Sequence, residues 1–156
     1  MHEPTVDRIR AAHSAATDVA RMPDGCIRPY ALGWATVDLD RAASELARDL
    51  GFSAEAFEET IGSQVLGARC RVAAGALGDG LSLAILEPAT EGRLAATLAR
   101  LGEGPAVAWY LTREDGAAGA RTLRDGPFGV ERLVAGDPIH GPHRFLIWPA
   151  AGTILP

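Results

Sequence analysis

Hydrophobic and polar positions follow two different periods along the 156 residues. Apolar residues at every second position, or in a short continuous run, are typical of strands, whereas apolar residues three and four apart are typical of helices. After an N-terminal helix, the pattern predicts one strand, one helix and three strands, and then the same order again. Strands are predicted at 30–40, 56–63, 68–77, 81–88, 105–112, 129–136, 143–149 and 152–156, and helices at 40–52, 90–102 and 113–126.

Residues 1–29 are predicted to be an extension that contains the N-terminal helix. Pro4 and Thr5 are suited to open this helix, and the turn at Pro23–Gly25 closes it. One face of the helix is weakly apolar and consists of Val6, Ile9, His13, Ala16 and Ala20. We therefore expect the helix to pack on the domain that follows, 30–156, or on a second subunit.

The helix at 40–52 carries signals at both ends. Asp40 is a plausible N-cap, because its carboxylate can accept a hydrogen bond from a backbone N–H of the first turn. Leu46 and Leu50 lie on one face, which we expect to point into the core. Gly51 ends the helix, since glycine adopts the left-handed conformation that a C-terminal cap requires.

The second half of the chain repeats the first. Gly33–Ala43 aligns with Ala108–Ala118 at an offset of 75, so that Trp34 matches Trp109 and the alanine pairs coincide. The repeat divides the domain into two modules, about 30–88 and 105–156, joined by the linker helix at 90–102. The fold class that follows is α+β, with two strand–helix–three-strand modules forming a curved mixed sheet around a cleft.

Composition and charge limit the classes of partner that we expect. Hydrophobic residues make up 47% of the chain, charged residues make up 22%, and the net charge is -5. A nucleic-acid partner is not expected, because a phosphate footprint needs a basic face. An acidic surface tolerates, or attracts, a cationic small molecule. The two cysteines, Cys26 and Cys70, are expected to be free thiols. No signal peptide and no apolar run of ~18 residues is visible, so we expect a cytoplasmic protein without a membrane partner.

Four segments resemble a known superfamily. They are "VDLDRAA", "LAILEP", "GRLAATLARLGEG" and "AVAWYL". In this order they resemble the vicinal oxygen chelate superfamily, which contains glyoxalase I, bleomycin-resistance proteins and extradiol dioxygenases, and they are most similar to methylmalonyl-CoA epimerases. The likeness covers about residues 30–156. It implies a curved sheet on which each module supplies two ligands to one divalent metal, which polarises substrate oxygens.

The metal-ligand positions that the resemblance implies hold no suitable side chain. They fall on Ala31 or Gly33, on Ala84, on Ala106 or Val107, and on Pro156 or beyond the end of the chain. A divalent metal needs carboxylate, imidazole or amide donors, so we expect neither a metal nor another cofactor. The carboxylate base of the epimerases falls near Ser63 or Gln64, and Glu58 and Glu59 lie upstream.

Several other side chains are candidates for binding or proton transfer. The expected ligand-binding residues are Gly33, Ala84, Val107, Trp109, Arg144 and Trp148, whereas Trp34 is expected in the core. Candidate catalytic residues are His140 and His143, because an imidazole titrates near neutral pH, and Glu87, which is either a rim carboxylate or a turn residue. Arg144 is expected to pair with an anionic ligand or with Asp137. A surface metal site of His140 and His143 with Asp137 or Glu131 is disfavoured, because Gly141–Pro142 prevents a helix there.

Two classes of function fit these observations. The first is a metal-free small-molecule binding protein of the bleomycin-resistance type, with an apolar, aromatic cleft for a bulky metabolite. The second is a metal-free isomerase, epimerase or cyclase that acts on a bulky metabolite, such as a polyketide- or acyl-thioester-derived compound, in the same cleft. A structural partner with a vestigial pocket is a third reading. Superfamily members often pair their modules across subunits, so we also expect a homodimer.

Overall fold

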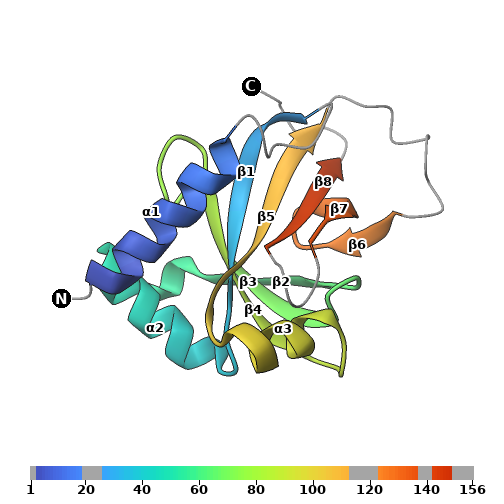
Figure 1. The fold of residues 1–156 in the computed structure, drawn as a ribbon. Coiled ribbons are helices and arrows are strands. Elements are labelled where there is room, and N and C mark those ends of the chain that lie inside the picture. Colours follow the sequence, from blue (N-terminus) through green and yellow to red (C-terminus); the bar gives the residue numbers. More distant parts are fainter. Residues whose placement is uncertain (1–2, 19–25, 113–122, 137–141, 149–156) are drawn as a thin grey trace.

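A computed structural model of the chain describes residues 3–18, 26–112, 123–136 and 142–148 (Figure 1). Its helices are α1 (Glu3–Thr17), α2 (Leu39–Leu50) and α3 (Arg93–Leu101), with a short 3-10 helix, η1 (Ala54–Ala56). Its strands are β1 (Cys26–Ala35), β2 (Glu58–Ser63), β3 (Ala68–Ala73), β4 (Ser82–Pro88), β5 (Gly104–Thr112), β6 (Arg124–Gly126), β7 (Gly129–Ala135) and β8 (His143–Trp148). These elements confirm the α+β fold with an N-terminal helix.

The described strands form one mixed sheet in the order β2-β3-β4-β1-β5-β8-β7-β6. β1 and β5 pair antiparallel at its centre, while β1 pairs parallel with β4 and β5 pairs parallel with β8. The sheet curls until its two edges approach each other, as Figure 1 shows. At this seam the backbone N–H of Gln64 donates to the carbonyl of Asp125 at 3.2 Å. The sheet is therefore nearly a closed barrel.

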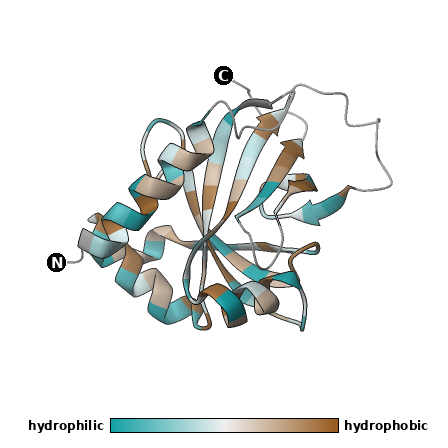
Figure 2. Cartoon of the chain, viewed as in Figure 1, coloured by the Kyte–Doolittle hydropathy of each residue, from teal (hydrophilic) through white to brown (hydrophobic). Residues whose placement is uncertain are grey.

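The two faces of the curled sheet carry separate cores, because successive side chains of a strand point to opposite faces. The outer face packs against α1 and α2, and its members include Leu32, Trp34, Leu83, Ile85, Tyr110 and Leu146. The inner face packs against itself and α3, and its members include Ala31, Ala84, Leu86, Val107, Trp109, Phe145 and Ile147. Figure 2 shows hydrophobic residues recurring along the strands and mixed with hydrophilic residues on the helices.

The N-cap of α2 is Asp38, so the prediction of Asp40 was wrong by two residues. The Asp38 carboxylate accepts a hydrogen bond from the backbone N–H of Arg41 at 3.1 Å. Asp40 instead lies in the first turn, where a negative charge also favours the helix, and it pairs with Arg71 at 2.7 Å. The predicted end at Gly51 is confirmed, since this glycine caps the helix with a φ of 84°.

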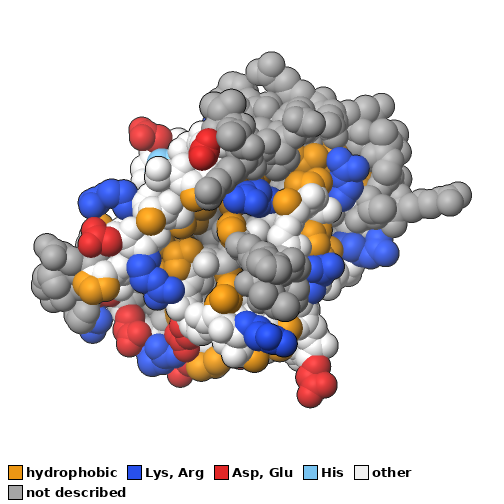
Figure 3. All heavy atoms as spheres, viewed as in Figure 1, with side chains coloured by type: hydrophobic (Ala, Val, Ile, Leu, Met, Phe, Trp, Pro, Cys, Tyr) orange, Lys and Arg blue, Asp and Glu red, His pale blue; other side chains and the backbone are white. Residues whose placement is uncertain are grey.

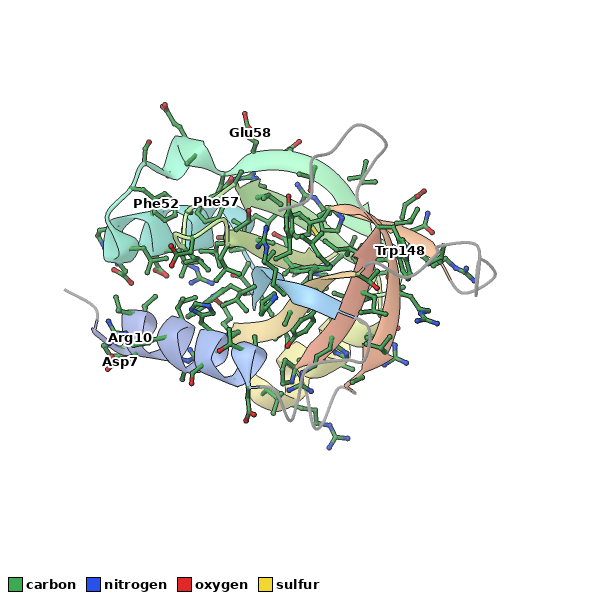
Figure 4. All side chains as sticks on the ribbon, turned by 90° about the horizontal axis from the view of Figure 1, so that it is seen from above. Asp7, Arg10, Phe52, Phe57, Glu58 and Trp148 are labelled. Carbon is green, nitrogen blue, oxygen red and sulfur yellow. The ribbon has the colours of Figure 1, made fainter. Side chains whose placement is uncertain are left out.

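Helix α1 is held to the domain by two hydrogen bonds that lie about two turns apart along the helix. In the first half of the helix, Arg8 Nη2 donates to the carbonyl of Glu103, just before β5, at 2.9 Å. Near its end, the hydroxyl of Tyr110 donates to the carbonyl of Ala16 at 3.0 Å. Asp7 and Arg10 lie on the side of α1 that points away from the sheet (Figure 4). The helix therefore lies as a bridge across the outer face of β1 and β5.

Other boundaries differ from the sequence prediction. β1 begins at Cys26 instead of residue 30, and a register shift beside Pro29 accommodates a residue that has no N–H to donate. The predicted helix at 113–126 is wrong at its end, where Arg124–Gly126 forms β6 and pairs with β7 across a tight turn. Gly129 closes this turn with a φ of 119°, which side chains disfavour. Residues 113–122 and the predicted strand 152–156 lie outside the described residues.

Replacement of Trp109 by alanine is expected to destabilise the fold. The Trp109 side chain is fully buried, its ring is stacked on Phe145 with centroids 6.1 Å apart, and it meets Phe128 edge-on. We expect Trp109→Ala to lower the free energy of unfolding by about 3–5 kcal/mol, measured by denaturant titration. The half-buried Trp148 provides a control, and Trp148→Ala is expected to cost about 1–2 kcal/mol. Equal losses in the two variants would contradict the inner core described above.

Candidate functional site

The inner face of the sheet, where the superfamily resemblance places a metal and its substrate, is filled by side chains. Gly33 faces inward from β1, opposite Val107 on β5. A Cβ added to Gly33 would lie 2.9 Å from the Trp109 ring, 2.9 Å from Val107 and 2.8 Å from Leu86. The missing side chain of Gly33 thus leaves the space that the Trp109 ring occupies. The expected ligand residues Gly33, Ala84, Val107 and Trp109 do converge, but they converge in a packed interior.

The residues at the metal-ligand positions do not fit a divalent metal. Gly33 pairs with Ala84, and on the other side of the sheet Val107 pairs with His143. By this symmetry the fourth position falls on His143 of β8, whereas Pro156 lies outside the described residues. His143 is buried, and its Nε2 lies 3.0 Å from Thr97 Oγ1. One imidazole is thus the single donor among the four positions, and the described residues contain no cluster of three His, Cys, Asp or Glu that could hold a metal.

A buried carboxyl group lies in the same interior. Glu131 of β7 is 0% exposed, and its two oxygens accept hydrogen bonds from Trp109 Nε1 at 3.0 Å and from Ser63 Oγ at 2.7 Å. Burial raises the pKa of Glu131 to about 7, although the two hydrogen bonds oppose the shift. A Cβ on Gly126 would collide with this carboxyl group. With this pKa, the carboxyl group changes charge near neutral pH. Its hydrogen bond with Ser63 also joins β7 to the end of β2.

Cys70 lies close to Glu131 but is chemically inert. Its thiol is free and buried, and burial raises its pKa to about 12. The negative charge of Glu131 contributes to this increase. Because the thiolate is the nucleophilic form of cysteine, Cys70 does not act as a nucleophile at neutral pH.

Glu87 holds the start of helix α2. Its Oε1 accepts a hydrogen bond from the backbone N–H of Leu39 at 3.0 Å, and its Oε2 lies 3.4 Å from Arg69 Nη1. It is half-buried at the end of β4. These contacts assign Glu87 a structural role, and a catalytic role for it remains a prediction.

Glu103 supports the loop between β1 and α2. Its carboxylate accepts hydrogen bonds from Arg41 at 2.6 Å, from Thr36 Oγ1 at 3.0 Å and from the backbone of Val37 at 3.3 Å. Burial acts to raise the pKa of Glu103, but these donors outweigh it and lower the pKa overall. This loop leads directly into α2, so Glu87 and Glu103 together fix the position of that helix.

The remaining predicted residues are scattered. Trp148 lies half-buried on the outer face, and Arg132 is 5.9 Å from its ring centroid. His140 and Asp137 lie outside the described residues. Glu131 and His143 both face the interior, which removes them from any surface site. Arg144 points to the outer face, on the same side as its cross-strand partner Ala108.

A pocket of about 360 Å³ lies between α1 and the outer face of β5 and β8. Alanines of α1, including Ala12 and Ala15, face Pro105 and Ala108 of β5 across it. Small side chains on both walls leave space between them, and the hydrogen bonds at Arg8 and Ala16 hold α1 in place across that space. Of the predicted ligand residues, Arg144 lines this pocket, and Val107, whose side chain belongs to the inner core, borders it from β5.

The charged side chains among the described lining residues of the pocket are both positive, although the protein is acidic. Arg8 and Arg144 line it, and none of the described lining residues is acidic. The Arg8 guanidinium lies 5.0 Å from the centroid of the Trp34 ring, which fixes it beside the pocket. Figure 3 shows hydrophobic side chains reaching the surface alongside α1, with arginine side chains around them. Sequence analysis missed this pocket, because it depends on how a helix from the extension crosses the sheet.

Comparison with known proteins gives matches in structure alone. Methylmalonyl-CoA epimerase from Mycobacterium tuberculosis has a TM-score of 0.61 and 19% sequence identity, covering 83% of this chain and 94% of that chain. A variant of the Streptomyces coelicolor epimerase, in complex with 2-nitronate-propionyl-CoA, has a TM-score of 0.59 and 23% identity, covering 81% and 99%. A hypothetical protein from Bacillus halodurans has a TM-score of 0.53 and 12% identity, covering 81% and 98%. No family model and no curated protein matches the sequence.

The topology and these matches show that the chain has the fold of the methylmalonyl-CoA epimerases, which is consistent with the vicinal oxygen chelate type. Within this fold, the methylmalonyl-CoA epimerases named above are similar to this chain over more than four-fifths of its length. At 19–23% identity the likeness shows the fold, and the function has to be argued from the site. None of the helices in the described residues combines the length and hydropathy of a membrane span.

The buried carboxyl group predicts a pH-dependent stability. An unfolded glutamate loses its proton near its ordinary pKa of 4.5, whereas Glu131 in the folded state keeps its proton up to about pH 7. Between these values the folded state binds more protons, so stability should fall as the pH rises, by about 3 kcal/mol at most. Glu131→Gln keeps the size and an oxygen that accepts from Trp109 Nε1, its amide N–H can donate to Ser63 Oγ, and it cannot ionise.

We therefore expect Glu131→Gln to melt at a higher temperature than the wild type at pH 8 and at a similar temperature near pH 4.5. Glu58 is exposed on β2, so Glu58→Gln serves as the matched control and should follow the wild-type curve. Melting curves recorded across this pH range test the expectation. Parallel curves for the wild type and Glu131→Gln would show that Glu131 does not titrate in this window.

Proposed function

We propose that this protein binds a bulky, largely apolar small molecule without a metal, and that the ligand lies in the pocket beneath α1. The observation that carries the proposal is the pocket itself, which is about 360 Å³ in volume and is walled by alanines, Pro105 and Leu32. Ligand pockets in proteins commonly have volumes of 300–1,000 Å³ and predominantly apolar walls. Metal independence is supported by Gly33, Ala84 and Val107, which offer no donor atoms.

Binding without chemistry is favoured by the lining of the pocket. Acid–base or nucleophilic catalysis needs a side chain with a suitable proton or lone pair within hydrogen-bond reach of the ligand. The described lining residues include no histidine, cysteine, serine or carboxylate. The hydroxyl of Tyr110 already donates to the carbonyl of Ala16. Sequestration or delivery of the ligand is therefore the role that we assign, and the homodimer expected from the sequence stays a prediction.

An epimerase-type reaction is the second candidate, and Glu131 is the observation that favours it. A carboxyl group with a pKa of about 7 is suited to proton transfer, and Ser63 lies beside it. A substrate would have to displace Trp109 to reach this group. Incubation with methylmalonyl-CoA in D₂O, followed by NMR of the α-proton, separates the two candidates. Exchange above the protein-free rate that is lost in Glu131→Gln would favour the enzyme.

The proposed pocket can be tested by filling it from the helix. N-phenyl-1-naphthylamine is a neutral apolar dye that fluoresces when it enters a dry site, and we expect it to bind the wild-type protein. Ala15→Leu places extra carbons in the pocket and should weaken this binding by about tenfold or more, while the melting temperature stays similar. Fluorescence titration measures the affinity.

Ser14 supplies the matched control for this experiment. It is exposed on α1 outside the lining of this pocket, so Ser14→Leu should bind the dye as the wild type does. Dialysis against EDTA should leave the wild-type affinity unchanged if no metal takes part. The absence of dye binding to the wild type, or equal binding by Ala15→Leu, would refute the proposed pocket.

A further inference from the structure

Arg144 is one of two cationic side chains among the described residues that line the pocket beneath α1. Arg144 lies near the start of β8, where its backbone is held between Ala108 of β5 and Ala135 of β7. It lines the pocket beneath α1, and its Nε is buried without a hydrogen-bond partner in the described part of the chain. A buried donor without an acceptor is unfavourable, so a molecule in the pocket that accepts a hydrogen bond from Arg144 would be stabilised there.

Arg8 adds to the positive charge of the same pocket. Its Nη2 donates to the carbonyl of Glu103, and its guanidinium rests against the Trp34 ring, so its position is set by the protein. The two arginines reach the pocket from different elements, Arg8 from α1 and Arg144 from β8. No carboxylate among the described lining residues neutralises them. The net charge of the protein is -5, so the two arginines make this pocket a local exception. Their charge favours the binding of a negatively charged group.

We propose that the ligand of this pocket is an amphiphilic anion, with an apolar body and one oxyanion group such as a carboxylate or phosphate. The oxyanion accepts hydrogen bonds from Arg144, whose planar guanidinium matches the geometry of two oxygens. The apolar body lies against the alanines of α1 and against Pro105 and Ala108. This inference rests on the proposed function and names the class of ligand that the pocket takes.

Two dyes of matched shape test the inference. 8-Anilinonaphthalene-1-sulfonate carries an oxyanion, and N-phenyl-1-naphthylamine has the same rings without it. We expect the sulfonate dye to bind the wild-type protein at least about tenfold more tightly than the neutral dye. Arg144→Gln should remove most of this difference. It should lower the affinity for the sulfonate dye about tenfold and change the affinity for the neutral dye less than about twofold. Arg100→Gln, an exposed position on α3 outside the lining, is the matched control and should change neither affinity.

Competition identifies the oxyanion that the pocket prefers. Decanoate, decyl phosphate and decanol are each used to displace the bound sulfonate dye. We expect decanoate or decyl phosphate to displace the dye and decanol to displace little of it. Whichever of the two anions displaces the dye at the lower concentration carries the headgroup that fits the pocket better. Decanol that competes as well as the acids would overturn the inference.

The outcomes separate this inference from the proposed function. If neither dye binds, the pocket is not a ligand site and both proposals fail. The anion inference alone fails if both dyes bind the wild type with equal affinity, or if Arg144→Gln has the wild-type affinity for the sulfonate dye. The pocket would then bind apolar molecules without selecting an anion. If Arg144→Gln does not fold, the wild type is titrated at increasing salt instead. The affinity for the sulfonate dye should then fall while that for the neutral dye does not, and equal salt dependence would overturn the inference.

Discussion

The antiparallel pairing of β1 with β5 is the constraint on which the rest of the structure depends. It joins the two modules at the centre of the sheet and places Gly33 opposite Val107. The parallel partners of these strands then bring Ala84 and His143 to the same region. Four positions from four strands thus converge on the inner face, where the resemblance described above implies a metal centre. Here the residues at three of those positions are Gly, Ala and Val, and the Trp109 ring fills the space above them.

Filling the interior has consequences on both faces of the sheet. On the inner face, Trp109 gives Glu131 a hydrogen-bond donor, so a carboxyl group is held in a place without water. On the outer face, α1 crosses the sheet, and the small residues of that helix leave a pocket. The packed interior and the pocket beneath α1 therefore lie on opposite faces of the same sheet.

The sequence predicted the elements that depend on local pattern and missed those that depend on packing. The alternating strands and the cap at Gly51 are local signals. Each predicted strand within the described residues overlaps an observed strand, and the cap is confirmed. The N-cap was misplaced, because Asp38 and Asp40 are equally good caps and the choice depends on Glu87, which binds the N–H of Leu39 from a distant strand. The strand β6 was predicted as helix, because the residues around Gly126 carry no strand period.

The site was the hardest part to predict. Glu131 is a charged residue in a strand, and its strand position alone does not show that Ser63 and Trp109 satisfy it within the barrel. A resemblance to proteins with an inner metal site also directs attention to the inner face. The pocket beneath α1 involves alanines, which carry no chemical signal, and it exists because two hydrogen bonds about two turns apart hold the helix off the sheet.

Helix α1 makes the pocket separable from the rest of the fold. One wall of the pocket belongs to this helix, which precedes the sheet in the sequence, and the other wall belongs to the sheet itself. The alanines of α1 that line the pocket take no part in the strand register or in the inner core. The shape of the pocket can therefore change while the strand pairing and the inner core stay the same.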